Sequence, residues 1–249
     1  LPIVMYHQVR NDGNEFLGDY VVSESQLKQD LAFLRKKGYN AVVGKDIVAH
    51  VQGIKPLPEK PIFITFDDGY ESFIATAYPL LQQYNMKAEV NIVGEYTDLY
   101  SQSVPKHLDY SHLNWSQLKE LYESPLVEIG NHTYDLHELN GRTGRKGAKI
   151  KRGESEAEYK KILTDDVVKL QDKMNEHLYD NARVFAYPYG FYSKESEQIL
   201  RDLGFDITLT CEEGVNIVTS DQSSLFALKR YNRPHRVETE VFFARMGIE

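Results

Sequence analysis

The sequence contains a single cysteine, Cys211, among 249 residues. One thiol cannot form an internal disulfide framework or a four-thiolate zinc site, so any metal ion must be held by histidines and carboxylates. The compartment stays open, because secreted domains of this size also fold without disulfides.

Long apolar runs are also missing. No segment approaches the roughly 18 uninterrupted apolar residues of a membrane span, and no basic start followed by an apolar run is found after Leu1. We therefore expect no integral membrane span in this sequence. A targeting segment was either never present or is missing.

Basic side chains are outnumbered, with 29 Lys and Arg against 37 Asp and Glu and a formal net charge of −8. This balance argues against the broad polyanion-binding surface that a nucleic acid requires. The hydrophobic content of 41% includes 17 Tyr and 11 Phe, which is enough for a buried core and far from the composition of disordered chains.

No period of 20 to 50 residues repeats, which argues against solenoids and propellers. Instead, strand-like and helix-like segments alternate. Strands are predicted at residues 2–6, 40–43, 61–66, 88–93, 127–130, 184–187, 207–210 and 226–230. Helices are predicted from residue 23 or 25 to 37 and at 72–84, 116–123, 156–178 and 193–203. Seven or eight such units favour a single TIM-like α/β barrel over residues 1–249, with reactive side chains where strands end.

Two segments depart from this alternation. Residues 95–114 read as a surface loop that walls a cleft. Residues 140–152 carry six Lys and Arg and three Gly without an acidic residue, which indicates a solvated loop insertion reaching to about residue 153. Contact of this basic loop with an anionic envelope polymer is the alternative.

Asp67 and Asp68 directly follow the apolar strand 61–66 and precede Gly69. Adjacent residues of an extended chain point to opposite sides, so the two carboxylates can serve different partners. One could bind a metal ion while the other accepts a proton from water. An ordinary Asp-Gly turn after a strand is the alternative interpretation.

His132 and His137 follow the strand 127–130. Five residues apart, they need a loop rather than a regular helix to reach one point. Two imidazoles with one carboxylate from another strand end form a ligand set suited to zinc that leaves positions open for water and substrate.

Three further segments carry polar groups at predicted strand ends. Pro188 breaks a strand, so the N–H of Tyr189 can be free to donate to an oxyanion, with a rigid turn as the alternative. His7 ends the first strand and is either structural or an acid that protonates a leaving amine. After the last strand, Arg230, Arg233 and His235 offer an orienting cation or another acid.

Together these residues resemble the NodB-like polysaccharide deacetylases, the family 4 carbohydrate esterases, over nearly the whole chain. Residues 65–69, Thr-Phe-Asp-Asp-Gly, match the first motif of that family, and His132 with Thr133 opens the second. The resemblance implies a distorted (β/α)7–8 barrel of NodB-homology type. It also implies that Asp67 is the general base and that Asp68, His132 and His137 hold one divalent metal ion.

Departures from the common pattern refine the resemblance. His137 comes one residue later than usual, which is similar to the poly-β-1,6-N-acetylglucosamine deacetylases of biofilm matrices. The arginine that usually precedes the Pro-Tyr-Gly turn is replaced by the Ala186-Tyr187 segment, and Arg230 is our first candidate for its role. A first strand that ends in Met-Tyr-His resembles the same branch, which favours His7 over His235 as the acid.

The implied activity is metal-dependent hydrolysis of N-acetyl groups on an extracellular or cell-surface N-acetylglucosamine polymer. As the polymer, poly-N-acetylglucosamine is favoured over peptidoglycan or chitin oligomers. As the metal ion, zinc is favoured over cobalt or nickel. The protein is expected to be a monomer. An O-acetyl esterase acting on xylan or peptidoglycan and a catalytically silent glycan-binding module are the alternatives. Candidate substrate contacts, chosen because sugar faces pack on rings, are Trp115, Tyr134, Tyr189 and Tyr192, with Pro188 beside them.

Overall fold

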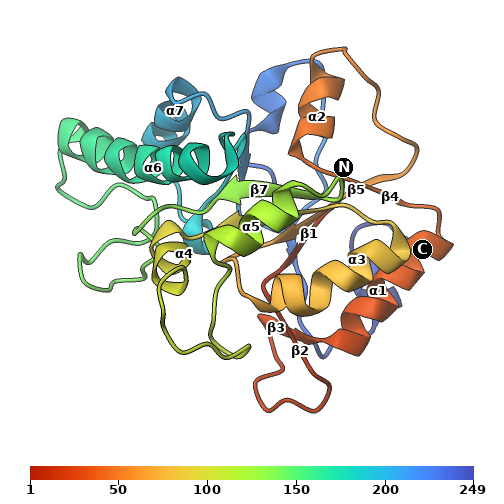
Figure 1. Ribbon diagram of the computed structural model, residues 1–249. Coiled ribbons are helices and arrows are strands. Elements are labelled where there is room, and N and C mark those ends of the chain that lie inside the picture. Colours follow the sequence, from red (N-terminus) through yellow and green to blue (C-terminus); the bar gives the residue numbers. More distant parts are fainter.

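The computed structural model describes all residues, 1–249, and is built around one parallel sheet (Figure 1). Its strands are β1 (Ile3–Tyr6), β4 (Asn40–Val42), β5 (Pro61–Phe66), β6 (Ala88–Ile92), β7 (Val127–Asn131), β8 (Val184–Ala186), β9 (Ile207–Leu209) and β10 (Tyr231–Asn232). The order is β10-β1-β5-β6-β7-β8-β9, and β4 pairs with the first half of β5. All neighbours are parallel, so the carboxyl ends of the strands meet at one end of the curled sheet.

The segment around β10 approaches both edges of this sheet. Leu228 makes one parallel bridge to Leu209 of β9, and Tyr231 pairs with Val4 of β1. The predicted strand 226–230 is wrong, because Ala227 takes a left-handed conformation (φ 56°) that interrupts an extended chain. The barrel is thus closed by only a few irregular contacts between strands, which gives the distorted barrel that the resemblance implied.

Eight α-helices surround the sheet, and none is long and apolar enough to cross a membrane. They are α1 (Glu24–Lys36), α2 (Gly44–Val51), α3 (Tyr78–Tyr84), α4 (Gly94–Tyr100), α5 (Trp115–Tyr122), α6 (Glu156–Leu178), α7 (Lys194–Asp202) and α8 (Thr239–Ala244). A π-helical turn, Phe73–Ala77, leads into α3. In Figure 1, α1 and α3 cover one side of the sheet, and α6 and α7 lie on the other side of the molecule.

The predicted long helices form where serine caps and apolar periodicity coincide. Ser23 accepts a hydrogen bond from the N–H of Gln26 at the start of α1, and Ser155 forms a capping box with Glu158 at the start of α6. The short helices α2, α4 and α8 were not predicted. The expectation of a loop over residues 95–114 is wrong in its first part, where α4 lies. The helix was missed because seven residues are too few to show a helical periodicity.

Two further strands were also missed. β2 (Gln8–Arg10) and β3 (Val21–Ser23) form a small parallel pair outside the main sheet. Three residues are too few to show an alternating pattern. This pair positions the segment between them, which includes Tyr20, beside the end of β1.

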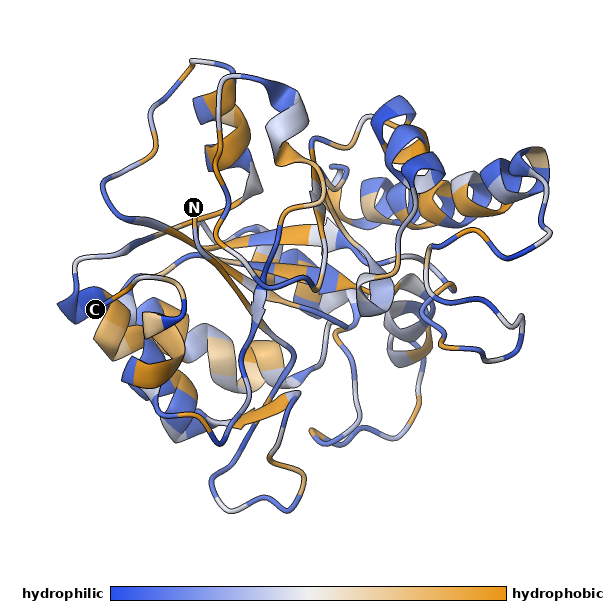
Figure 2. Cartoon of the chain, turned by 180° about the vertical axis from the view of Figure 1, so that it is seen from behind, coloured by the Kyte–Doolittle hydropathy of each residue, from blue (hydrophilic) through white to orange (hydrophobic).

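Apolar side chains alternate between two cores. On β5, Ile62, Ile64 and Phe66 belong to the large core under the helices, whereas Phe63 belongs to a smaller core. That smaller core also holds Val184 and Ile207, so it fills the inside of the curled sheet. Figure 2 shows apolar residues along the central strands and on parts of the helices beside them.

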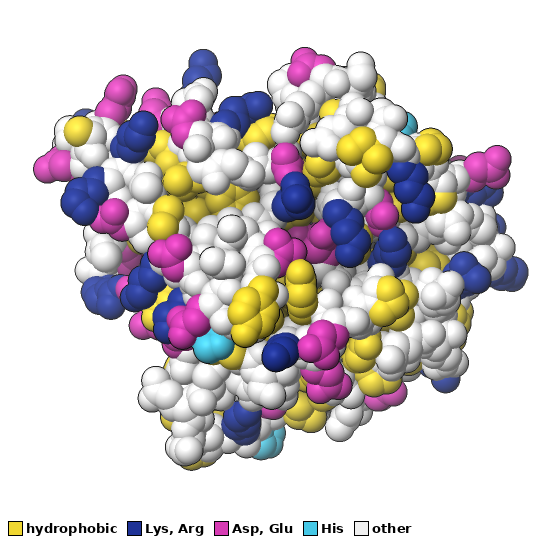
Figure 3. Space-filling model, turned by 45° about the horizontal axis from the view of Figure 1, so that its top comes forward, with side chains coloured by type: hydrophobic (Ala, Val, Ile, Leu, Met, Phe, Trp, Pro, Cys, Tyr) yellow, Lys and Arg dark blue, Asp and Glu magenta, His cyan; other side chains and the backbone are white.

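The basic segment 140–152 is more ordered than a fully solvated loop. Arg145 is only 2% exposed, and its guanidinium forms hydrogen bonds to Glu154, one of them 3.0 Å long. Glu154 lies two residues after the basic segment, so counting the charges within residues 140–152 did not reveal this partner. On the face in Figure 3, acidic and basic side chains are interspersed, in keeping with the absence of one large basic surface there.

Candidate active site

Asp67 and Asp68 sit at the end of β5, where the chain turns sharply. Asp68 and Gly69 are both left-handed, with φ of 70° and 69°, and Gly69 packs against Ile92 so closely that an added Cβ would lie 3.0 Å from its side chain. The turn gives the two carboxylates different neighbours. Asp67 contacts Arg230, whereas Asp68 lies against two histidines.

Asp68, His132 and His137 converge on one point. The Oδ1 atom of Asp68 is 3.5 Å from Nε2 of His132 and 3.1 Å from Nε2 of His137, and the three ligand atoms lie within 4.8 Å of one another. Nδ1 of His132 lies 2.7 Å from the carbonyl oxygen of Ala186. Donation from Nδ1 leaves the Nε2 lone pair free for a metal ion. This donor set fits a divalent metal that takes nitrogen and oxygen ligands.

We expect metal affinity to increase with pH because a proton competes for His132. Burial opposes protonation, but the hydrogen bond to Asp68 and the charges of Asp67 and Asp68 raise the pKa of His132 above its usual 6.5. A protonated imidazole has no lone pair at Nε2. Zinc titrations between about pH 5 and 8 should therefore show affinity rising through the raised pKa. Affinity that is independent of pH over this range would contradict the assignment of His132 as a ligand.

The loop that carries His137 is fixed from two sides. Thr133 takes a left-handed conformation (φ 72°), and its carbonyl oxygen accepts a hydrogen bond from the N–H of Gly94 at the start of α4. From α6, the carboxylate of Asp166 accepts hydrogen bonds from the N–H groups of Tyr134, at 2.7 Å, and Asp135, at 2.8 Å. Burial raises the pKa of Asp166 to about 6. One carboxylate thus determines where the loop runs between the two histidines.

Replacing Asp166 with alanine should weaken metal binding without removing a ligand. The N–H groups of Tyr134 and Asp135 would lose their acceptor and His137 would lose its fixed position. Losing a group that orients a metal ligand typically costs about 10- to 100-fold in metal affinity. Isothermal titration with zinc measures the change. Asp165→Ala is the matched control, since Asp165 is exposed on the same helix and pairs only with Lys161. Equal affinities in the two variants would show that Asp166 does not position the loop.

Asp67 is 2% exposed and is held by three hydrogen bonds. Arg230, itself 0% exposed, donates to both carboxylate oxygens at 2.8 and 2.7 Å, and Nδ2 of Asn91 donates at 2.8 Å. Burial alone would raise the pKa of Asp67, but the charges of Arg230, His132 and His7 together with the hydrogen bonds from Arg230 outweigh burial and hold this pKa well below its usual value. Arg230 in turn donates from Nε to the carbonyl oxygen of Thr210. Arg230, our candidate for the role of the arginine that is absent before Pro188, therefore contacts the aspartate that the resemblance implies is the base.

A cavity of about 560 Å³ opens above these groups. Its lining contains Asp67, Asp68, His132 and His137 together with His7 and Tyr189; His235 is not part of it. The ring of His7 packs edge-on against Tyr20 at 5.0 Å. Burial lowers the pKa of His7, against the charges of Asp68 and Asp67, so the protonated ring is a stronger donor. Of the two candidate acids, only His7 borders the cavity.

Tyr189 lines the cavity and has a backbone N–H that is free to donate. Its backbone is left-handed (φ 57°) within the turn after Pro188, and its N–H makes no backbone hydrogen bond. The adjacent glycine packs against Cys211, where an added Cβ would lie 2.7 Å from the Cys211 side chain. A free N–H on a fixed turn beside the metal ligands is suited to bind developing negative charge.

Four candidate substrate contacts lie outside this cavity lining. Trp115 is 6% exposed, stacks on His177 and donates from Nε1 to Asp98, so it packs α5 against its neighbours. Tyr134 also donates to Asp98, and Tyr192 stacks on Tyr187. Pro188 is buried, and its carbonyl oxygen faces Gly147. The presence of an aromatic ring in the sequence did not distinguish side chains that line the cavity from side chains that pack helices and loops against one another.

Other residues of the cavity lining were not predicted. They are Met5, Gln8, Tyr20, Val21, Tyr70, Leu139, Cys211 and Asn232. Gln8 directly follows His7, and Tyr70 follows the Asp-Asp-Gly segment, so the rule that reactive residues follow strand ends could have found these two. Tyr20 and Leu139 come from segments with no strand signal before them.

Comparison with known proteins agrees with this architecture. A family model described as polysaccharide deacetylase matches residues 54–208. The poly-beta-1,6-N-acetyl-D-glucosamine N-deacetylase of Escherichia coli strain K12 is 31% identical over 210 residues, which cover 78% of this chain and 31% of that protein. The chain thus spans about a third of the length of this relative.

Solved structures share the fold. IcaB from Ammonifex degensii has a TM-score of 0.76 at 26% identity, over 94% of this chain and 91% of that one. A de-N-acetylase from Aggregatibacter actinomycetemcomitans has a TM-score of 0.83 at 23% identity, over 98% and 99% of the two chains. The predicted resemblance and the distorted barrel are confirmed, and the chain belongs to the polysaccharide deacetylase family.

Proposed function

We propose that this chain hydrolyses N-acetyl groups on a polysaccharide containing N-acetylglucosamine, and that it uses one divalent metal ion. The observation that carries the proposal is the convergence of Asp68, His132 and His137 beside Asp67 in one cavity. The relative from Escherichia coli is named for poly-β-1,6-N-acetylglucosamine, which makes this polymer the favoured substrate over peptidoglycan or chitin oligomers.

Three residues of the cavity are assigned roles in this proposal, and their contacts support the assignment. Asp67, fixed and ionised by Arg230, accepts the proton of the attacking water. The free N–H of Tyr189 donates to the oxyanion that forms from the acetyl carbonyl. His7, on the same cavity, gives a proton to the departing amine, leaving acetate and a free amino sugar.

Asp68, His132 and His137 would hold the metal ion. When bound, such an ion polarises the acetyl carbonyl and makes a water molecule more acidic. Two imidazoles with one carboxylate favour zinc, with cobalt and nickel as alternatives that bind the same donors. The nearby Asp67 is kept out of this ligand set by its two bonds to Arg230.

The cellular location of the protein is inferred from its proposed substrate. A polymer of this kind lies outside the cell, so we infer a cell-surface or secreted role. One domain over residues 1–249, the basic insertion around 140–153 and a monomeric state remain predictions. An O-acetyl esterase acting on xylan or peptidoglycan would use the same groups, and a silent glycan-binding module would retain them without turnover.

Acetate release tests the proposal. The protein, stripped with a chelator and reloaded with zinc, cobalt or nickel, is incubated with poly-β-1,6-N-acetylglucosamine, chitin oligomers, peptidoglycan and acetylated xylan. We expect release from the first polymer, its loss in chelator and its recovery with zinc. Faster release from acetylated xylan would favour the esterase, and retention on the glycan without acetate would favour the binding module.

A further inference from the structure

A line of buried polar side chains extends from Asp67 into the barrel. On β6, Glu89 and Asn91 are both 0% exposed, and they pair in register with Glu128 and Gly130 of β7. Their neighbours on the same strand, Ala88, Val90 and Ile92, belong to the core under the helices. Because strand side chains alternate, Glu89 and Asn91 face the inside of the barrel.

Gly130 leaves the space in which these two side chains meet. A Cβ at this position would lie 2.0 Å from Oδ1 of Asn91 and 2.9 Å from Oε1 of Glu89. Both oxygens therefore occupy the volume that a side chain at residue 130 would fill. Both are also buried and have no hydrogen-bond partner among the protein atoms.

The orientation of the Asn91 amide is determined at its other end. Its Nδ2 donates to Oδ1 of Asp67 at 2.8 Å, so its Oδ1 must point toward Glu89. Two buried oxygen acceptors that face one another without a donor between them form an unfavourable arrangement. A proton on Glu89 converts this conflict into a hydrogen bond.

The surroundings of Glu89 favour the neutral carboxyl. Burial raises the pKa of Glu89 well above its usual value, and the charge of Glu128 adds to the effect. The N–H of Gly44 donates to Oε2 of Glu89 at 3.3 Å, and the N–H of Lys45 donates to Glu128 at 2.9 Å. Burial raises the pKa of Glu128 as well, but Glu128 is the more exposed of the pair and lies against the first turn of α2, so we assign the proton to Glu89 and the charge to Glu128.

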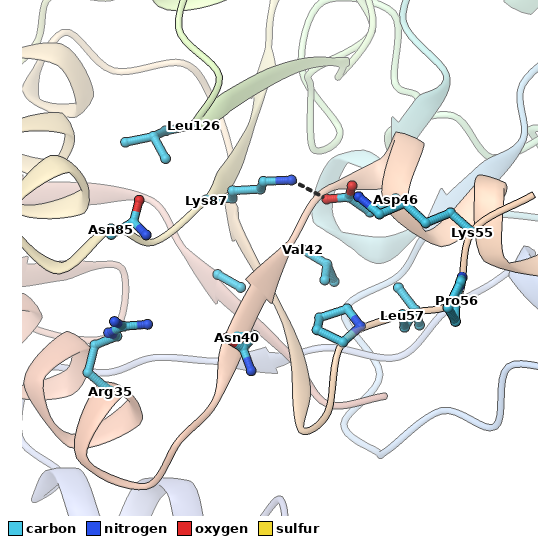
Figure 4. Close-up of a pocket in the computed structure, with 12 residues that line it drawn as sticks. Arg35, Asn40, Val42, Asp46, Lys55, Pro56, Leu57, Asn85, Lys87 and Leu126 are labelled. Atoms are coloured by element: carbon cyan, nitrogen blue, oxygen red, sulfur yellow. Dashed lines mark hydrogen bonds and ion pairs between the residues drawn. The ribbon is translucent and has the colours of Figure 1, made fainter.

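A salt bridge fixes α2 against the start of β6. Lys87 immediately precedes β6, and its Nζ atom lies 2.6 Å from a carboxylate oxygen of Asp46 in the first turn of α2. Figure 4 marks this contact. The groove around this pair is lined by Arg35, Asn40, Val42 and Leu126 among others, and it shares no residue with the cavity that holds Asp68. The N–H donors of Gly44 and Lys45 are therefore held in place over the two glutamates.

We propose that Glu89 is a positioning residue of the active site: its neutral carboxyl donates a hydrogen bond to Oδ1 of Asn91, directly or through one water molecule, and so holds the Asn91 amide against Asp67. Glu89 touches neither substrate nor metal ligand. Its effect on catalysis runs through Asn91 and rests on the proposed function, in which Asp67 is the base.

Kinetics of three variants test this coupling. Glu89→Leu removes the donor and should lower kcat about tenfold with little change in KM, since one hydrogen bond to the base is lost. Glu89→Gln keeps a donor for Asn91 and an acceptor for Gly44, so kcat should stay within about twofold of wild type. Asn91→Ala should match Glu89→Leu, and the double variant should lose no more than either single one. Losses that multiply in the double variant would overturn the proposal.

Two further measurements separate positioning from general damage. Leu163→Ala, in the core on α6, lowers stability but should leave kcat unchanged. Infrared spectra at neutral pH should show the carbonyl stretch of a neutral carboxyl in the wild type and its loss in Glu89→Gln. If no such band belongs to Glu89, the proposal fails. This band is recorded without turnover, so it can succeed even if the wild type releases no acetate, which would instead overturn the proposed function.

Discussion

Replacing Asp67 with asparagine should abolish most acetate release while the metal ion stays bound. An amide cannot take a proton from water, and loss of a general base typically costs roughly 10²- to 10⁴-fold in rate. The three proposed ligands are untouched, since Asp67 bonds to Arg230 and Asn91 rather than to His132 or His137. Metal analysis of the purified variant, with kcat measured beside it, checks both halves of this expectation.

Asp68→Asn is the matched control, because it makes the same chemical change one residue away. It removes the carboxylate that lies 3.1 Å from His137, so metal content and activity should fall together. Added zinc should restore part of the activity of Asp68→Asn and none of that of Asp67→Asn. If Asp67→Asn loses its metal while Asp68→Asn keeps it, the roles of the two aspartates are reversed.

The reactive segments could be predicted because strand ends of a parallel barrel share one rim. Each reactive segment follows a strand that the sequence predicts clearly, and all of them line one cavity. These segments are Asp67 with Asp68, the His132–His137 segment, His7 and Tyr189. The three ligand atoms come close together because Asp68 and Thr133 take left-handed backbone conformations. The residue types at these positions do not predict such conformations. The roles of these residues remain predictions.

The lining of the cavity was harder to predict than its reactive groups, because an aromatic ring packs equally well in a core. Trp115 and Tyr134 share one partner, Asp98, which joins α4 to α5 and to the loop after β7. Such packing depends on contacts between distant segments that no local pattern shows. Arg230 was named as a cation at the end of the predicted strand 226–230 and as the candidate for the role of the missing motif arginine, whereas the observed strand β10 begins one residue later. Its contact with Asp67 comes from the irregular chain between β9 and β10.

Arg230→Met should destabilise the metal-free protein by about 3–5 kcal/mol at neutral pH, since it leaves Asp67 as a buried charge without its partner. The pH dependence identifies the cause. In the wild type the pKa of Asp67 is depressed, so its contribution to stability is present above pH of about 4 and is lost as the pH falls. In the variant the arginine no longer opposes burial, so this pKa should rise toward its usual value and the contribution that the wild type has above a pH of about 4 should be missing.

The difference in unfolding free energy between Arg230→Met and wild type should therefore widen from acid toward neutral pH in urea titrations. Arg183→Met is the matched control, because Arg183 pairs with Asp206 at 3.0 Å but is 55% exposed. An exposed ion pair contributes at most about 1 kcal/mol, so this variant should change little at any pH. A constant difference for Arg230→Met would mean that Arg230 supports the fold by packing alone. A widening one means that the guanidinium keeps Asp67 ionised, as a base beside a metal site must be.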